Sequence, residues 1–441
     1  MSFAYFPHTP DDIAVMLERA GVSSLEELYS DIPDSLRFMG EYDLPDAMSE
    51  MEVRCYFEAL DRSNTKLTVF CGAGAYDHYT PSAVKYIVSR SEFLTAYTPY
   101  QAEISQGTLR YIFEFQSMIC ELTGMDCANA SMYDGPTSAA EAMLMSVASS
   151  KKRRRILVSS TLLPQVLDVV KTYASYHGIR LDVVGQAGGN TSLSSLDALL
   201  AEGDVAGVLV PGINRYGIIE DLTGFADAVH SSGALLAVYS DPSSLAVLKT
   251  PGEWGADIAC GDGQTLGIPL CFGGPYAGFL ACRQNLMRKL PGRIVGATTD
   301  MDGRRSFVLT LQAREQHIRR EKATSNICSN QSLMALFVTV YLSLMGPDGL
   351  KKVNDLSYGG AHYLHDRLLA TGKFSDVFDR SFLKEFVLGT TLDTDVLQQS
   401  LLDAGFFGAL RTEEGYVSFC VTERRTKAEI DAMVDVIDKI G

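Results

Sequence analysis

The sequence lacks several patterns that mark common classes of protein. Positive charge is in deficit, since 38 lysines and arginines stand against 54 aspartates and glutamates and give a net charge of −16. Nucleic acid and anionic membrane surfaces are therefore disfavoured as partners. The nine cysteines form no C-x-x-C pair, and several lie in apolar runs, which is typical of reduced thiols. Patterns of a serine hydrolase triad or a P-loop are also missing.

Signals for export, membrane insertion and metal binding are missing as well. The first residues carry no basic segment followed by an apolar core, and no uncharged apolar stretch approaches membrane-spanning length, so we expect a cytoplasmic protein. His362, His365 and Asp366 share one face of a predicted helix, but no further ligand nearby would complete a tetrahedral site. We therefore expect a solvated helix face and no metal.

The N-terminal region is expected to be a helical arm. Thr9 is an N-cap signal before residues at helical spacing, and Ser24 with Glu27 matches a capping box for a second helix. We assign residues 1–62 to this arm. Packing of the arm on the rest of the chain and packing on a partner subunit are equally open.

Two further domains follow the arm. Short continuous apolar runs alternate with helical segments in residues 63–325, which predicts a large α/β domain with a mostly parallel sheet between helices. Long helices and a few strands in residues 326–441 predict a smaller C-terminal α+β domain. The strands expected in the large domain are 156–158, 181–184, 205–210, 235–239 and 258–260.

One part of the predicted sheet lacks lysine altogether. Residues 250–288 contain a short apolar strand, a glycine-rich turn and a hairpin that pivots on Gly273-Gly274-Pro275. This layout resembles the region where fold-type I pyridoxal phosphate (PLP) enzymes carry their Schiff-base lysine. The nearest position holds Gln264, and an amide nitrogen cannot form an imine because its lone pair is delocalised. Either the chain performs no PLP chemistry by itself, or the fold interpretation is wrong.

Several longer motifs make a family resemblance specific. They are residues 72–79, 91–107, 113–116, 129–135, 263–269 and 314–331. Together they resemble the glycine dehydrogenase (decarboxylating) P-protein family, and more narrowly subunit 1, the alpha chain of its two-subunit bacterial form. Because the motifs are spread over nearly the whole chain, the resemblance applies to the whole fold.

The resemblance implies a fold-type I PLP-dependent transferase fold and a role in glycine cleavage. In that family glycine is decarboxylated with PLP as electron sink, and the remaining aminomethyl group passes to the lipoyl arm of H-protein. The family's lysine belongs to the beta subunit, so its absence here is what an alpha assignment requires. The resemblance further implies that PLP is bound through the beta subunit, that the isolated chain is inactive, and that the subunits form an α2β2 heterotetramer.

Residues 97–106 supply the candidate side chains for completing the partner's active site. They concentrate phenol, amide and carboxylate groups beside a turn fixed by proline, and two phenols could orient a small amino acid or the lipoyl arm. A purely structural turn is an open alternative. The candidates are Tyr97, Tyr100, Gln101, Glu103 and Gln106.

Four more residues occupy positions where a catalytic fold-type I enzyme would bind PLP. Gly135 and Thr137 stand at the start of a predicted helix, whose free amides would bind phosphate. Asp241 follows a strand, where an aspartate would pair with the pyridine nitrogen, and Gln264 takes the lysine's position. Since Schiff-base chemistry is missing, a helix cap and a strand-end turn are the alternative interpretations.

Two other functions stay open at this stage. The chain could be an independent PLP aminotransferase or decarboxylase with a displaced lysine such as Lys249 or Lys289, although that lysine would have to lie at the carboxyl edge of the sheet. It could also be a purely structural scaffold. Arg319 and Arg320 could bind a carboxylate, but we favour a salt bridge between domains or subunits.

Overall fold

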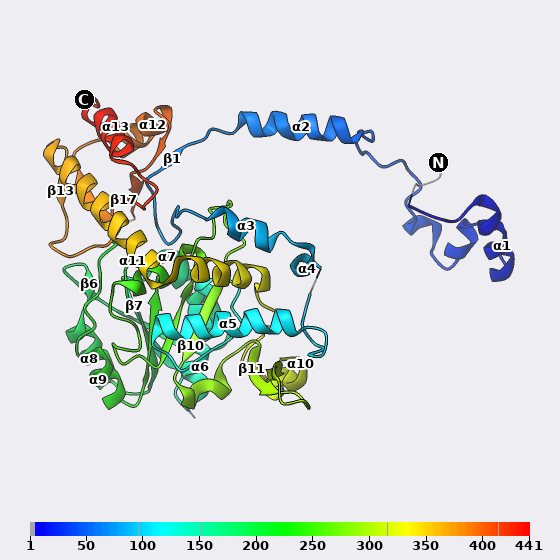
Figure 1. Cartoon of the computed structure of the whole chain (residues 1–441), viewed down its shortest axis with the longest axis horizontal. Helices are drawn as coiled ribbons and strands as arrows, with labels where there is room; N and C mark the ends of the chain where they lie inside the picture. The colour runs from blue at the N-terminus through cyan, green and yellow to red at the C-terminus, as the bar shows by residue number, and fades with distance from the viewer. Residues whose placement is uncertain (1–4, 96, 151, 315, 413) are drawn as a thin grey trace. The chain divides into compact units, whose positions relative to one another are not determined.

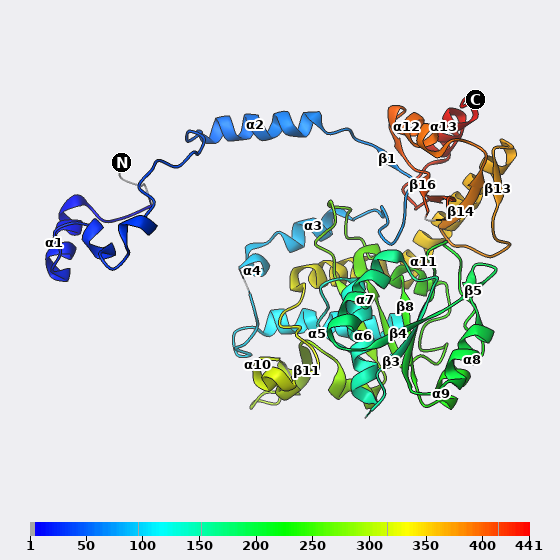
Figure 2. The same cartoon turned by 180° about the vertical axis from the view of Figure 1, so that it is seen from behind.

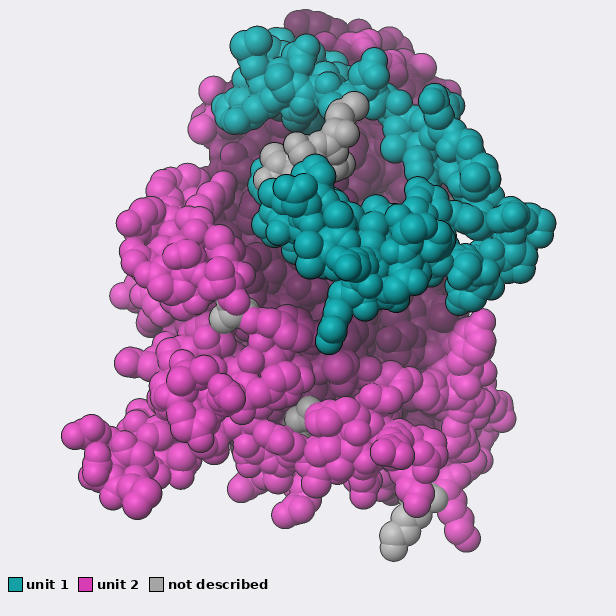
Figure 3. Space-filling model, turned by 90° about the vertical axis from the view of Figure 1, so that its right-hand side faces the viewer, with its two compact units in different colours: residues 1–65 teal, residues 66–441 magenta. Residues whose placement is uncertain are grey.

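The computed structural model describes residues 5–95, 97–150, 152–314, 316–412 and 414–441. The chain forms two compact units, Met1–Thr65 and Lys66–Gly441, which Figure 3 shows in different colours. The boundaries expected from the sequence, after residue 62 and after residue 325, remain predictions.

The first unit contains helices α1 (Pro10–Ala20) and α2 (Glu50–Ser63). The predicted N-cap of α1 is confirmed, because the Thr9 hydroxyl accepts a hydrogen bond from the Asp12 N–H and the Asp12 carboxylate accepts one from the Thr9 N–H. Neither α1 nor α2 contains a buried residue. The apolar side chains of both helices are therefore exposed or at most half-buried, as Ile13 and Leu17 are.

The second helix predicted for the arm is wrong. Only a single 3₁₀ turn, Glu26–Tyr29, forms after Ser24. The physical reason is that the Glu27 carboxylate accepts from the N–H and hydroxyl of Ser23, so the reciprocal bond that would close a capping box with Ser24 is not made.

A seven-stranded sheet organises the second unit, in the order β2-β10-β9-β8-β7-β3-β4. The strands β3, β4, β7, β8 and β9 are parallel, whereas β10 is antiparallel to both of its neighbours. The parallel strands are those predicted from continuous apolar runs, which confirms the mostly parallel sheet. The bounds are β2 Cys127–Ala128, β3 Arg155–Ser159, β4 Arg180–Val184, β7 Val205–Pro211, β8 Leu235–Ser240, β9 Ile258–Asp262 and β10 Gly278–Cys282.

Helices cover both faces of this sheet. One face packs against α5, α8, α9 and the first half of α11 (Ser332–Ala370), and Phe115 and Leu196 share a core cluster with Val208 of the sheet. The other face packs against α6 and α7, through residues such as Met143 and Val166. Figure 1 shows α5 in front of the sheet, and Figure 2 shows α6 and α7 there. The bounds are α5 Gln106–Thr123, α6 Gly135–Ser149, α7 Pro164–Tyr176, α8 Leu193–Ala201 and α9 Phe225–Ser231.

A hairpin that the sequence did not predict packs on α5. It consists of β11 (Ile294–Thr299) and β12 (Arg305–Thr310), and its Val295 and Phe307 form a cluster with Leu109. The hairpin thereby anchors the start of α5, where the candidate residues 97–106 lie. Smaller elements are α3 Ser82–Val88, α4 Ser91–Leu94, β5 Gln186–Ala187, β6 Asn190–Thr191 and α10 Gln316–Arg319.

The C-terminal part contains a four-stranded antiparallel sheet in the order β13-β14-β17-β16. The long helix α11 (Ser332–Ala370) is kinked where Gly346 has a φ of 58°, so the long helices expected after residue 326 are confirmed. Strand β1 pairs with β15, and Phe70 enters the C-terminal core. The bounds are β1 Thr68–Val69, β13 Phe374–Asp376, β14 Glu385–Thr390, α12 Thr394–Asp403, β15 Phe406–Phe407, β16 Leu410–Arg411, β17 Val417–Cys420 and α13 Lys427–Asp438.

Helix α11 corrects one expectation about apolar stretches. By length and composition it could cross a membrane, contrary to the prediction that no stretch approaches that length. Phe337 and Tyr341 in its first half are buried in the core beside the large sheet. A core helix passes the same test of length and composition, so α11 does not indicate a membrane protein.

Candidate functional site

The positions predicted for a PLP site do meet in space, at the carboxyl edge of the large sheet. Asp241 directly follows β8, and Gln264 follows β9. Asp262, the last residue of β9, contacts the start of α6 at Gly135. Parallel strands bring their carboxyl ends to one edge, which is why residues far apart in the sequence converge there.

Gln264 is a structural clamp. Its side chain is fully buried, and its carbonyl oxygen accepts from the N–H of Tyr76 at 2.8 Å. Its amide nitrogen donates to the carbonyl oxygens of Tyr76 at 2.8 Å and Ile268 at 2.7 Å. Every polar atom of this amide is therefore used to fasten the segment around Tyr76 to the turn after β9.

Asp241 has a partner that the sequence did not suggest. The ammonium of Lys384, which enters from the residue before β14, lies 2.7 Å from an Asp241 carboxylate oxygen, and both side chains are buried. The same Nζ lies 3.1 Å from the Ser243 hydroxyl. Burial opposes ionisation of Asp241, but the Lys384 charge outweighs it and lowers the pKa of this carboxyl. Lys384 thus neutralises the aspartate that would face a pyridinium nitrogen in a catalytic relative of this fold.

His78 extends this network toward Glu423, which follows β17. Its Nε2 accepts from Lys384 Nζ at 3.0 Å, and its Nδ1 lies 2.7 Å from the Glu423 carboxylate. Burial and the adjacent ammonium lower the pKa of His78, so the ring is neutral near pH 7 with its proton on Nδ1. A chain of buried polar groups from Asp241 to Glu423 therefore fills this side of the site.

The start of α6 is also occupied by the chain's own carboxylates. The N–H of Gly135 donates to Asp262 at 2.8 Å, and the N–H of Thr137 donates to Asp134 at 2.7 Å. Burial raises the pKa of Asp262 to about 6. The helix-cap interpretation is supported here, because an entering phosphate would find these amides taken and two carboxyl groups beside it.

The remaining space does not accommodate PLP. The cavity bordered by Tyr76, Tyr239, Asp241 and Asp262 has a volume of about 20 Å³. That volume holds about one water molecule. Because the lysine position carries Gln264, the aspartate is paired and the phosphate amides are capped, the residues of this chain do not fit the cofactor, and no chemical step is assigned to it here.

The candidates at 97–106 lie elsewhere and behave in two ways. Tyr97 and Tyr100 are 79% and 66% exposed, and Gln101 and Glu103 are exposed as well. Gln106 is instead a clamp, whose amide nitrogen donates to the Phe307 carbonyl at 2.9 Å and whose oxygen accepts from the Phe307 N–H at 2.9 Å. Within the described residues no hydrogen bond, ion pair or ring contact joins these five to the buried pseudo-site.

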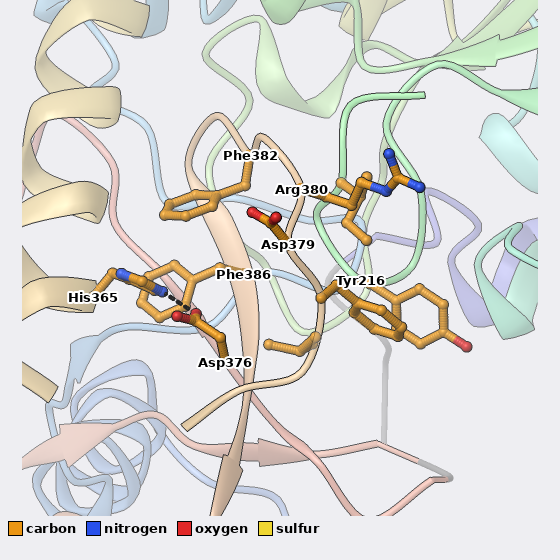
Figure 4. Close-up of a pocket in the computed structure, with 10 residues that line it drawn as sticks. Tyr216, His365, Asp376, Asp379, Arg380, Phe382 and Phe386 are labelled. Carbon is orange, nitrogen blue, oxygen red and sulfur yellow. Dashed lines mark hydrogen bonds and ion pairs between the residues drawn. The ribbon is translucent and has the colours of Figure 1, made fainter. Parts of the chain in front are cut away.

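The histidines expected on a solvated helix face are partly buried. His362 stacks on Phe382 with ring centroids 4.0 Å apart, and His365 lies 2.7 Å from Asp376. They pack here because α11 lies against the loop before β14. His365 lines a pocket of about 270 Å³ together with Asp376 and Phe382, which Figure 4 shows. The solvated-face interpretation was therefore wrong.

A salt bridge of Arg319 or Arg320 within the described chain is not present, and one to another subunit remains a prediction. Both side chains are exposed, and neither pairs with a carboxylate of the described chain. The displaced lysines do not reach the pseudo-site aspartate either. Lys249 Nζ lies 3.8 Å from the centroid of the Trp254 ring, and Lys289 donates to the Ala148 carbonyl at 3.0 Å.

Comparison with known proteins identifies the family to which this chain is similar. A family model of the glycine cleavage system P-protein matches residues 3–437. A relative from Moorella thermoacetica named "Probable glycine dehydrogenase (decarboxylating) subunit 1" is 50% identical over 436 residues, which cover 98% of this chain and 98% of the relative. The relative of the same name from Desulforamulus reducens is 49% identical over 438 residues, covering 97% of this chain and 98% of the relative.

Solved structures give the same answer for the fold. A crystal structure of glycine decarboxylase (P-protein) of the glycine cleavage system, in inhibitor-bound form, is 41% identical with a TM-score of 0.93, and the match covers 100% of both chains. An alanine–glyoxylate aminotransferase from Nostoc sp., 16% identical, shares the fold with a TM-score of 0.61 over 92% of this chain and 98% of its own. The fold is thus that of the fold-type I PLP-dependent transferases, and the chain belongs to the glycine cleavage system P-protein family.

Proposed function

We propose that this chain is subunit 1 of a glycine dehydrogenase (decarboxylating) and works only as part of a complex. A second subunit holds PLP, which supplies the electron sink for glycine decarboxylation, and the aminomethyl group passes to the lipoyl arm of H-protein. The names of relatives that are 49% and 50% identical over nearly their full length support the activity. Neither an independent PLP enzyme nor a pure scaffold is favoured by these relatives.

The observation that carries the division of labour is the Lys384–Asp241 ion pair. The Lys384 ammonium lies 2.7 Å from the carboxylate with which a bound pyridinium would otherwise pair. The amide of Gln264 cannot form the Schiff base that a lysine amine would form. A subunit with these two features has no use for PLP of its own. This supports placing the cofactor on the second subunit.

Exposed apolar surface supports a stable partner for the chain. Single exposed apolar side chains are ordinary on a protein surface, but their density in residues 5–65 and 79–104 is not. The second subunit is the partner that the relatives' names imply, and we propose an α2β2 heterotetramer in the cytoplasm. The large exposed apolar residues include Tyr29, Phe38, Met39, Tyr42, Met51, Tyr56, Phe57, Tyr86, Tyr97, Tyr100 and Ile104.

Borohydride reduction in the presence of PLP tests where the cofactor is held. The chain alone, the second subunit alone and the reconstituted complex are reduced and mapped by peptide analysis. We expect a labelled lysine in the second subunit and none in this chain. Stoichiometric labelling of a lysine of this chain would contradict the proposal, and mass measurement of the complex by light scattering checks the stoichiometry.

Alanine at Tyr97 and Tyr100 tests whether the chain completes the partner's site. The assay is exchange of the glycine carboxyl group with bicarbonate, followed by transfer to lipoylated H-protein. We expect both variants to fold and assemble, because exposed phenols contribute little to the chain's own core. If the phenols help to position the substrate, the rate of exchange should fall at least tenfold. Unchanged rates in an intact complex would favour the scaffold. Tyr176→Ala, at another exposed tyrosine, is the matched control.

A further inference from the structure

We propose that Arg293 is the centre of an oxyanion-binding site that this chain contributes to the complex. The residue is only 5% exposed, yet its guanidinium forms no ion pair with a carboxylate of the described residues. Arg155, buried to the same degree, pairs with both Asp182 and Glu202. A buried cation is strongly unfavourable unless an anion compensates it. Arg293 is therefore short of one negative charge.

The guanidinium is held behind a surface tyrosine. Arg293 Cζ lies 5.6 Å from the centroid of the Tyr100 ring, and within the described chain the guanidinium makes a single hydrogen bond, a long contact of 3.5 Å from Nη2 to the Tyr100 hydroxyl. Its Nε has no acceptor among the same residues. Tyr100 itself is 66% exposed, so a single side chain separates the charge from the surface.

The surroundings provide a second donor on a rigid frame. The buried Thr98 hydroxyl has no partner in the part of the chain that the structure describes, and the Tyr100 N–H donates to the Thr98 carbonyl at 2.9 Å, which places both residues in one turn. The Ala130 N–H donates to the Arg293 carbonyl at 2.8 Å, so the arginine backbone is fixed just before β11. The two segments that meet at the contact of Tyr100 with Arg293 thus each carry a donor without an acceptor among the described residues, which is what an anion needs.

The chemistry of the donors defines the ligand. A planar guanidinium with a free N–H edge binds carboxylate or phosphate oxygens bidentately. The inference rests on the proposed function, because Tyr97 and Tyr100 lie on the surface that we assign to the second subunit's active site. Two oxyanions are present there, the carboxylate of glycine and the phosphate of PLP. Arg293 binds one of them across the subunit boundary.

The test replaces Arg293 in the reconstituted complex. We expect Arg293→Met to raise the KM for glycine in bicarbonate exchange at least tenfold if the ligand is the substrate carboxylate. If the ligand is the phosphate, the dissociation constant for PLP, measured by titrating cofactor-free complex, rises at least tenfold instead. Arg305→Met removes an exposed arginine at the opposite end of the β11–β12 hairpin and should change neither value. Arg293→Lys, which keeps the charge but not the fork, should lie between wild type and methionine.

Stability of the isolated chain separates binding from a structural role. Removing an unpaired charge should leave the urea midpoint of Arg293→Met unchanged or higher, whereas Arg155→Met, which breaks two ion pairs, should lower it. A lower midpoint for Arg293→Met, or unchanged glycine and PLP constants, overturns the inference. So does a loss confined to subunit assembly, which would assign Arg293 to an ion pair with the partner. An inactive wild-type complex would instead refute the proposed function.

Discussion

Replacing Lys384 by methionine is the most direct test of the buried pseudo-site. The side chain is nearly the same length, so the change removes the charge with little loss of volume. It leaves the buried Asp241 without a counter-ion, although Ser243 still donates hydrogen bonds to it. Breaking one side of a buried ion pair costs about 3–5 kcal/mol. The free energy of unfolding should fall by that amount, measured in urea at pH 7 from the fluorescence of Trp254, the chain's one tryptophan.

The Lys384 prediction also fixes the direction in which the free energy of unfolding changes with pH. In the wild type the pKa of Asp241 is lowered, so the stability from the pair is present at neutral pH and is lost as the pH falls through that value. In Lys384→Met the lowering effect of the ammonium is removed, and burial, the largest influence on Asp241, should raise the pKa of this carboxyl above its unfolded value. Lowering the pH should then stabilise the variant, and the pH profiles of the two proteins should slope in opposite directions.

Two further variants make the Lys384 prediction refutable. The double variant Lys384→Met with Asp241→Asn removes both charges and should recover most of the loss, since neutral groups bury more cheaply than a single charge. Lys351→Met breaks an exposed pair of similar length, 2.6 Å to Asp355, and should cost no more than about 0.5 kcal/mol. A loss below about 1 kcal/mol in Lys384→Met, or a double variant as unstable as the sum of the single changes, would refute the reasoning.

Three other changes, one of them with a control in α5, probe the pseudo-site and helix α6. Gln264→Lys restores an amine but leaves a cavity of about 20 Å³, so dialysis after incubation with PLP should leave no visible absorbance band and borohydride should label no lysine; a stable band would contradict the fit argument. Gly135→Ala would place a Cβ 2.4 Å from the Tyr239 hydroxyl and should cost about 2 kcal/mol in urea unfolding, whereas Gly107→Ala, which meets open space inside α5, should gain about 0.5–1 kcal/mol. Burial raises the pKa of Glu141 to about 7, so the stability linked to its neutral form is lost as the pH rises through that value; Glu141→Gln should unfold at higher urea than wild type at pH 8 and at the same urea at pH 4.

The large sheet could be predicted from the sequence because a strand buried on both faces leaves a continuous apolar run. Val205–Pro211 is such a run, and every residue in it is buried. The prediction of a helix after Ser24 was wrong, because it depended on a single side-chain contact and not on a run of residues. A capping box depends on which serine a glutamate reaches, and Glu27 reaches Ser23, a difference of one position that residue spacing does not resolve.

Part of the pseudo-site could be predicted as well. Asp241 and Gln264 do follow strands and Gly135 does begin a helix, as the pattern of the sequence predicted, although their role as a former cofactor site remains a prediction. What Gln264 bonds to could not be predicted, since its partner Tyr76 is far away in the sequence. Sequence reasoning also missed Lys384. The signal that could have found it is the pair of adjacent charged residues, Lys384 and Glu385, at the start of an apolar strand, because buried charges need a partner of opposite charge.

Lys384 changes the meaning of the lysine-free stretch from residue 250 to 288. Losing the Schiff-base amine alone would leave Asp241 as a buried carboxylate without a cation, and such a group either takes up a proton or destabilises the fold. Lys384, the residue directly before β14, removes that cost, and it lies more than 100 residues away from β9 in the sequence. The missing lysine at position 264 and the buried Lys384 thus both bear on how the charge of Asp241 is balanced. It follows that Gln264→Lys and Lys384→Met should be coupled, because the amine introduced by Gln264→Lys is tolerated better once the ammonium of Lys384 has been removed.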